Sequence, residues 1–291
     1  MASFASELKN ELARIYDRDI NIAKYELIAL LKCGTVSVDN HIDFVNSNAA
    51  VARKVLKLIK KFFPNIITEV SAIRIKNLRH FNRYYVKIYE NESSKYLFQK
   101  INSNKMPTSY KAQTAYLRGA FLSSGTINKP QAQYHAEIAV SSKPLSRFIQ
   151  NIMFNFELPA KIFERKDQYV IYLKNFDVIL DFLYLINAES AIEKFEVARN
   201  IKEVRIQVNR IMNCEDANIN RSINASQRQI KDIKHIFDKG ITLKDHLKQT
   251  ANLRLQNPDL TLAELADKLY ISTSGLKGRM RKLHKIAQSV K

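Results

Sequence analysis

The stretch YLRGAFLSSGTINKP, Tyr116 to Pro130, predicts a helix that ends at Gly125 and continues directly into a strand. Ser123 and Ser124 occupy the last turn of this helix. Glycine suits such a position because it adopts the left-handed conformation without steric cost and lets another segment approach closely. We therefore expect Gly125 to end a helix in the left-handed conformation and to lie against a second helix end.

A second copy of the pattern lies 91 residues earlier. In ELIALLKCGTVSV, Leu30-Leu31-x-x-Gly34-Thr35-Val36 matches Phe121-Leu122-x-x-Gly125-Thr126-Ile127. We expect Gly34 to end its helix in the left-handed conformation as well. Each glycine is followed by alternating β-branched segments, an amphipathic helix (49–63 and 143–156), further strand-like runs and a closing helix. The repeat predicts an α+β fold: two αββαββα units related by a pseudo-two-fold axis, with the two glycine-terminated helices packed together and the sheets forming a saddle. Two unrelated helix-stop signals are the alternative explanation.

The charge of the chain favours a polyanionic partner. Lys and Arg number 47 against 28 Asp and Glu, for a net charge of +19. Residues 1–112 hold 19 basic and 10 acidic side chains, residues 206–291 hold 16 and 8, and the middle segment holds 12 and 10. Phosphate neutralisation makes nucleic acid the leading partner, ahead of an anionic membrane surface. We expect a cytoplasmic protein, because the sequence has neither an apolar run long enough to span a membrane nor a signal peptide.

Several classes of site are not indicated. Cys33 and Cys214 are too far apart in sequence for a zinc knuckle, and the six histidines lack the spacings of zinc enzymes. Neither a phosphate-binding P-loop nor a dinucleotide-binding glycine motif is present. We therefore expect neither a metal nor a cofactor.

The C-terminal segment NPDLTLAELADKLYISTSGLKGRMRKLHKIA predicts a helix-turn-helix at 261–287. Thr261 and Glu264 have the spacing of a capping box at the start of a helix over 262–270. Ala266 suits a close helix crossing, and a buried stripe in the second helix is expected from Leu276, Met280 and Leu283. Tyr270 stands where a turn glycine is common.

If that stripe is buried, the opposite face of the second helix is available to DNA. Short polar groups at its start and long cations along it can bond base edges, whereas cations at its flank are better placed for phosphates. The predicted contacts are Ser272, Thr273, Ser274, Lys277, Gly278 and Arg281, with Arg279, Lys282 and Lys285 at the flank. A basic, solvated helix in a small bundle is the alternative.

The segments SFASELKNEL and AYLRGAFLSSGTINKP, together with the helix-turn-helix, resemble the WhiA family of bacterial transcription factors, whose frame is similar to LAGLIDADG homing endonucleases. In those endonucleases, each motif helix supplies an acid just before its terminal glycine, and the two acids hold Mg²⁺. The matching positions here are Cys33 and Ser124. The resemblance therefore implies a DNA-binding scaffold that has lost its cutting chemistry, and not an enzyme.

The resemblance also implies a role in bacterial cell division, chromosome segregation or sporulation. The expected partners are double-stranded DNA and another transcription regulator or sigma factor, and the expected state is a nucleoid-associated monomer. The alternatives are a residual metal-dependent homing endonuclease and a non-specific nucleic-acid or RNA-binding protein. The aromatic and basic stretch at 79–98 is either an additional DNA contact or strand core.

The expected domains follow from these patterns. Residues 1–110 form the first half of the saddle, and residues 111–212 form the second half with an exit helix. Residues 213–225 are rich in Asn and Ser, which favours turns and hence a linker. Residues 226–291 form the helical DNA-binding domain, with Asn224 or Ser226 capping a helix that runs through Phe237 and ends by Gly240.

Overall fold

The computed structural model describes residues 3–38, 41–74, 82–103 and 105–289 of the chain. The chain forms two compact units, Met1–Ile201 and Lys202–Lys291, called here the N-terminal unit and the C-terminal unit. Within the described residues, no helix is both long and apolar enough to cross a membrane.

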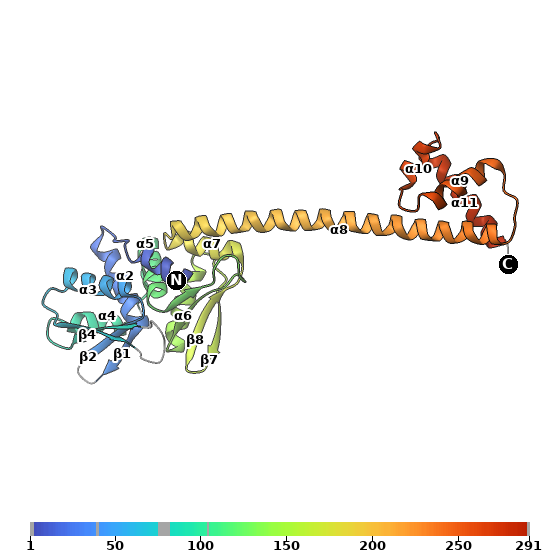
Figure 1. Cartoon of the computed structure of the whole chain (residues 1–291). Coiled ribbons are helices and arrows are strands. Elements are labelled where there is room, and N and C mark those ends of the chain that lie inside the picture. Colours follow the sequence, from blue (N-terminus) through green and yellow to red (C-terminus); the bar gives the residue numbers. More distant parts are fainter. Residues whose placement is uncertain (1–2, 39–40, 75–81, 104, 290–291) are drawn as a thin grey trace. The chain divides into compact units, whose positions relative to one another are not determined.

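The N-terminal unit repeats one order of elements twice (Figure 1). After α1 (Phe4–Leu12), the first half contains α2 (Ile20–Gly34), β1 (Thr35–Val38), β2 (His41–Asn46), α3 (Ala49–Phe62), β3 (Thr68–Arg74), β4 (Asn82–Tyr89) and α4 (Lys95–Asn102). The second half contains α5 (Tyr110–Ser124), β5 (Gly125–Ile127), β6 (Ala136–Val140), α6 (Lys143–Phe154), β7 (Lys161–Arg165), β8 (Gln168–Leu173) and α7 (Phe176–Leu185). The predicted αββαββα repeat is confirmed.

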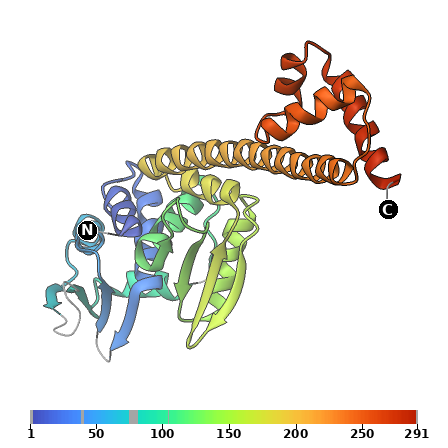
Figure 2. The same ribbon diagram turned by 45° about the vertical axis from the view of Figure 1, so that its right-hand side comes forward.

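Each half builds one antiparallel four-stranded sheet, and the two sheets have the same strand order, β1-β2-β4-β3 and β5-β6-β8-β7. Alternation along β2 buries Ile42, Phe44 and Asn46 while their neighbours stay half-exposed. Such alternation leaves one face of a sheet for the helices and the other for solvent. In both views of the N-terminal unit, the strands of the two sheets extend away from α2 and α5 (Figure 2).

The two motif helices, α2 and α5, pack directly against each other. The hydroxyl of Ser123 on α5 donates to the carbonyl of Leu30 on α2 over 2.9 Å. A Cβ placed on Gly119 would lie within 3.0 Å of the Glu26 carbonyl oxygen, so only glycine fits at that crossing without a shift. The predicted packing of the glycine-terminated helices is confirmed.

The left-handed conformation expected at the two terminal glycines is wrong. Gly125 has φ −74° and ψ 152°, which is extended backbone, and Gly34 lies outside the left-handed region as well. Close packing is the physical reason for glycine there. A Cβ on Gly34 would lie within 3.0 Å of Ser123 and Phe44, and one on Gly125 would meet Phe121.

The exit helix is much longer than the sequence pattern indicates. Helix α8 (Glu189–Asp238) runs through residues 213–225, where turns and a helix cap at Asn224 or Ser226 were expected. The segment contains neither glycine nor proline, so nothing in it breaks the helical hydrogen-bond ladder. Gly240 follows the end of α8 with φ +67°, as its predicted place after the helix requires. The division of the chain into domains at 213–225 stays a prediction.

The C-terminal unit contains the end of α8 together with α9 (Asp245–Gln256), α10 (Leu262–Lys268) and α11 (Thr273–Ser289). Its core is made of buried side chains from all four helices: Ile233, Ile236, Leu247, Ala251, Leu265, Ala266, Leu276, Met280 and Leu283. Two polar contacts tie the unit together. Ser226 on α8 donates to the Pro258 carbonyl over 2.6 Å, and buried Arg254 donates to the Leu260 carbonyl over 2.7 Å.

Candidate nucleic-acid interface

Helix α10 begins at the predicted capping box. The Thr261 hydroxyl accepts from the backbone N–H of Glu264 over 3.3 Å, and the Glu264 carboxylate accepts from the backbone N–H of Thr261 over 2.7 Å. These bonds to Thr261 lower the pKa of the Glu264 carboxyl, because they stabilise its charged form. The start of the helix-turn-helix is therefore held by reciprocal hydrogen bonds, as the sequence predicts.

The turn between α10 and α11 is made by Tyr270. Its φ is +53°, a conformation that costs a residue with a side chain about 1–2 kcal/mol. Its side chain is 96% exposed. The helix ends at Lys268, two residues before the predicted end, because Leu269 already caps it and Tyr270 leaves the helical region. Tyr270 thus adopts the left-handed backbone conformation that glycine commonly provides in such a turn.

The predicted stripe of α11 is buried. Leu276, Met280 and Leu283 pack into the core of the C-terminal unit together with Ala266 of α10. Leu269 and Ile271, on either side of the turn, are partly buried against the same core. The helical period therefore turns the opposite face of α11 away from the core.

The nine predicted contact residues fall on or beside that face, with different degrees of exposure. Seven of them are exposed, namely Ser272, Thr273, Ser274, Lys277, Arg281, Lys282 and Lys285, while Gly278 and Arg279 are half-buried. None of the exposed cations forms an ion pair within the part of the chain that the structure describes. The face combines unpaired positive charge with small polar groups, the composition that phosphates and base edges require.

Two of the predicted residues also have a role inside the domain. The Ser272 hydroxyl accepts from the Gly275 N–H over 3.1 Å and so caps α11. The Arg279 guanidinium donates to the His246 carbonyl and to the Thr250 hydroxyl of α9, each over 3.3 Å. Arg279 therefore joins α11 to α9, and its predicted contact with a phosphate stays a prediction.

A further contact, not anticipated from the sequence, fixes α11 on α8. The ring Nδ1 of His284 lies 2.7 Å from Oδ2 of Asp232. His284 directly follows buried Leu283 on α11, so a contact with a neighbouring helix could have been expected. The partner could not be identified, because Asp232 lies 52 positions earlier in the sequence.

In the N-terminal unit, Cys33 and Ser124 occupy the last turns of α2 and α5, as predicted. Burial raises the pKa of the Cys33 thiol to about 12, so this group is neutral at physiological pH. The Ser124 hydroxyl oxygen is buried without a hydrogen-bond partner among the described residues. The described residues contain no group of three or more His, Cys, Asp or Glu side chains arranged to hold a metal ion.

Some of the charges on the sheets of the N-terminal unit are paired. Lys87 on β4 faces Asp43 and Glu69 on its two neighbouring strands, and its Nζ lies 4.0 Å from Glu69. Glu137 on β6 lies 3.1 Å from Arg165 and 3.0 Å from His135. Local carboxylates therefore neutralise part of the positive charge of the sheets.

The stretch at 79–98 was expected to be either strand core or an additional DNA contact, and its residues fall into two groups. Residues 79–81 lie outside the described residues. Val86 and Ile88 are strand core, while Tyr85, Lys87 and Tyr89 alternate with them along β4. The Tyr89 hydroxyl donates to the Glu69 carboxylate over 2.8 Å. Strand core is confirmed for part of the stretch, and DNA contact by the rest stays a prediction.

Comparison with known proteins places these features in one family. Three family descriptions match successive segments of the chain: "WhiA N-terminal LAGLIDADG-like domain" at residues 20–102, "WhiA LAGLIDADG-like domain" at 113–205 and "WhiA C-terminal HTH domain" at 208–287. The saddle and the helix-turn-helix derived above correspond to these domains. The fold is thus an α+β LAGLIDADG-like unit followed by helical elements that carry a helix-turn-helix.

Whole-chain relatives agree with the domain matches. A "Probable cell division protein WhiA" of Desulforamulus reducens is 37% identical over 311 residues, covering 99% of this chain and 96% of the relative. Another, of Thermoanaerobacter sp., is 36% identical over 313 residues, covering 99% and 98%. The structure described as "full-length DUF199/WhiA from Thermatoga maritima" aligns with a TM-score of 0.65 and 26% identity over 99% of both chains. Since such relatives match nearly end to end, the chain belongs to the WhiA family.

Proposed function

We propose that this protein binds duplex DNA through α11 and regulates transcription in bacterial cell division, chromosome segregation or sporulation. The observation that carries the proposal is the exposed face of α11, where four cations without ion pairs among the described residues accompany the small polar groups at the helix start. The relatives named as probable cell division proteins support the biological setting. DNA binding through α11 would associate the protein with the nucleoid.

We infer further that the scaffold does not cut DNA. A hard divalent cation binds oxygen ligands, above all carboxylates. The positions just before Gly34 and Gly125 instead offer a thiol, whose raised pKa keeps it protonated, and a hydroxyl. Neither group carries the negative charge that would hold the cation, so the residues present do not fit the metal of an endonuclease. Monomeric action and recruitment of a second regulator or sigma factor belong to the same proposal.

The full-length protein should be incubated with a random duplex pool and Mg²⁺ or Mn²⁺, and both the enriched sequences and the DNA ends should be scored. We expect an enriched motif with intact ends. Metal-dependent cut ends that persist in a Ser124→Ala, Cys33→Ala double variant would point to a contaminating nuclease, whereas cutting lost in that variant would refute the inference. Retention of DNA without any sequence preference would favour the non-specific nucleic-acid alternative.

A further inference from the structure

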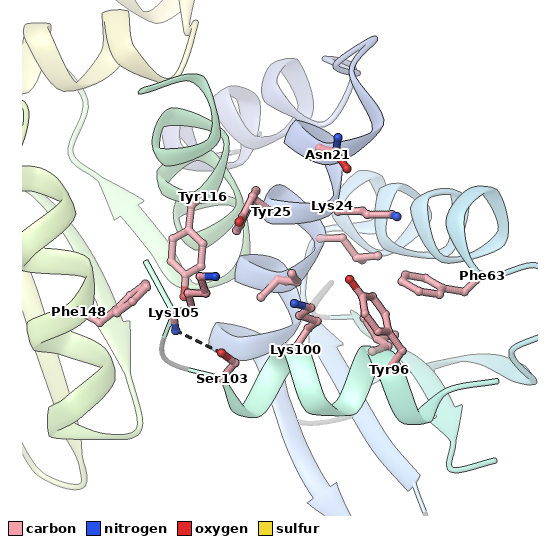
Figure 3. Close-up of a pocket in the computed structure, with 13 residues that line it drawn as sticks. Asn21, Lys24, Tyr25, Phe63, Tyr96, Lys100, Ser103, Lys105, Tyr116 and Phe148 are labelled. Carbon is pink, nitrogen blue, oxygen red and sulfur yellow. Dashed lines mark hydrogen bonds between the residues drawn. The ribbon is translucent and has the colours of Figure 1, made fainter. Parts of the chain in front are cut away.

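A pocket of about 200 Å³ lies in the N-terminal unit, where the two halves of the repeat meet (Figure 3). Its walls come from α2 and α4 of the first half and from α5 and α6 of the second. The lining residues are Asn21, Lys24, Tyr25, Leu27, Ile28, Phe63, Tyr96, Leu97, Lys100, Ser103, Lys105, Tyr116 and Phe148. A ligand held there would contact both halves at once.

Two aromatic pairs form opposite sides of the pocket (Figure 3). The rings of Phe63 and Tyr96 lie 6.2 Å apart on one side, and those of Tyr116 and Phe148 lie 5.3 Å apart on the other. Aromatic side chains on both sides of a cavity favour a planar ring between them, because offset and edge-on contacts of rings are stabilising. The lining thus suits an aromatic ligand better than an aliphatic one.

The charge of the lining has one sign. Lys24, Lys100 and Lys105 are lining residues, and the lining includes neither aspartate nor glutamate. The side chains of Lys24 and Lys105 form no ion pair with the residues that the structure describes, and the Lys100 ammonium lies 5.3 Å from the centre of the Tyr96 ring. Three ammonium groups around one cavity favour a bound anion.

A buried donor completes the arrangement. The Tyr116 side chain is buried, and its hydroxyl has no hydrogen-bond partner among the described residues. An unpaired buried hydroxyl costs about 1–3 kcal/mol, so such groups are rare unless a ligand or water satisfies them. Burial raises the pKa of Tyr116, so the hydroxyl keeps its proton and can donate it to an acceptor in the pocket.

The wall that carries Phe148 is itself held in place. Lys32 of α2 donates to the Ser103 carbonyl over 2.8 Å, and the same ammonium lies 5.4 Å from the centre of the Phe148 ring. The backbone N–H of Lys105 donates to the Ser103 hydroxyl over 3.2 Å (Figure 3). These contacts join α2, the end of α4 and α6 around the cavity, so the pocket is formed before any ligand arrives.

We propose that this pocket binds a small aromatic anion, a planar ring that carries a phosphate or carboxylate group. The ring lies between the two aromatic pairs, its acidic group faces Lys24, Lys100 and Lys105, and the Tyr116 hydroxyl donates to an acceptor on the ring. The proposal does not depend on the proposed DNA-binding function, because every residue in it belongs to the N-terminal unit.

Calorimetric titration of the full-length protein tests the proposal, with adenosine monophosphate and 4-hydroxybenzoate as aromatic anions. Adenosine and inorganic phosphate are the matched controls, since each lacks one of the two required features. We expect at least one aromatic anion to bind about tenfold more tightly than either control. Equal binding of adenosine would refute the role of charge, and equal binding of phosphate would refute the role of the rings. Absence of binding by both aromatic anions at millimolar concentration would overturn the proposal.

Three variants locate the binding site. Lys100→Glu should lower the affinity for the aromatic anion at least tenfold. Lys57→Glu, the same change at an exposed position of α3 outside the pocket, should leave that affinity unchanged. Tyr116→Phe should lower the affinity for the aromatic anion about fivefold, in the range of one lost hydrogen bond, without lowering the stability of the ligand-free protein. Affinity unchanged by Lys100→Glu and Tyr116→Phe would place the ligand elsewhere and contradict the proposal.

Discussion

Arg118 on α5 donates from Nε to Oε1 of Glu26 on α2 over 3.0 Å, and these two side chains are 2% and 1% exposed. The Arg118 guanidinium also pairs with Asp17, and the Glu26 carboxylate pairs with the fully buried ammonium of Lys54 on α3. Lys54 further donates to the carbonyls of Leu12 and Ile15. Two carboxylates and two cationic side chains thus neutralise each other's charge inside the N-terminal unit, and their contacts join its two halves.

Removing the shared acid of this network should destabilise the protein strongly. Glu26→Gln leaves Lys54 without its carboxylate and Arg118 with Asp17 alone, and an uncompensated buried charge costs about 3–5 kcal/mol. Arg118→Met should cost less, because Glu26 keeps Lys54 as its partner. Urea unfolding of the N-terminal unit checks the order of the two effects. A larger loss from Arg118→Met would show that Glu26 is not the centre of the network.

The same substitution should have opposite effects at two helical glycines. At Gly119 a Cβ would meet the Glu26 backbone carbonyl, which cannot move without shifting α2, so Gly119→Ala should destabilise the unit by about 1–3 kcal/mol. At Gly278 in α11 a Cβ would meet nothing within 4 Å, so Gly278→Ala should stabilise α11 by about 0.5–1 kcal/mol. Thermal unfolding of the two variants measures both signs, and stabilisation by Gly119→Ala would rule out the close crossing of α2 and α5.

Tyr270→Gly should not destabilise the helix-turn-helix, although it removes a large side chain. Relief of the left-handed strain should raise the free energy of unfolding by about 1–2 kcal/mol. The greater freedom of glycine in the unfolded chain should lower it by about 0.5–1 kcal/mol. The exposed ring contributes little packing, so the net change should lie between zero and about 1 kcal/mol of stabilisation. Denaturant unfolding of the full-length variant provides the number. A loss above about 1 kcal/mol would mean that the ring packs in solution.

Lys9 on α1 should make the protein more stable in mild alkali. Burial lowers the pKa of its ammonium to about 8, compared with about 10.4 in the unfolded chain. Between these values the unfolded chain binds more protons than the folded one, so the free energy of unfolding rises with pH, by at most about 3 kcal/mol. Below pH 8 the gain is absent. Urea unfolding at pH 7 and pH 10 should show a smaller rise in Lys9→Met, and equal rises in both proteins would exclude Lys9 as the cause.

The sequence was sufficient for the features that depend on local periodicity. The repeat of αββαββα, the capping box of Thr261 and Glu264, and the buried stripe of α11 all follow from residue spacing. It was misleading where one local signal had two physical meanings. Glycine at positions 34 and 125 indicates tight packing here and not a left-handed cap, and the Asn-rich segment 213–225 remains helical because it lacks glycine and proline.

Features made by residues far apart in the chain could not be predicted. Glu26 and Arg118 each lie within an apolar helical stretch, which suggests burial with a partner, but 92 positions separate them and nothing local pairs them. The Arg279 contact with α9 arises in the same way. The aromatic pocket combines short pieces of α2, α4, α5 and α6, none of which carries a motif.

The affinity of α11 variants for the enriched duplex, measured across a range of salt concentrations, tests the central claim most directly. Lys277→Ala and Arg281→Ala should each weaken binding to that sequence by about 1–3 kcal/mol and lower its advantage over random DNA. Lys285→Ala should mainly reduce the salt dependence, and Lys234→Ala on α8 serves as the charge-matched control. The account predicts specific losses confined to α11. Unchanged affinity in the α11 variants, or equal losses on every sequence, would contradict it.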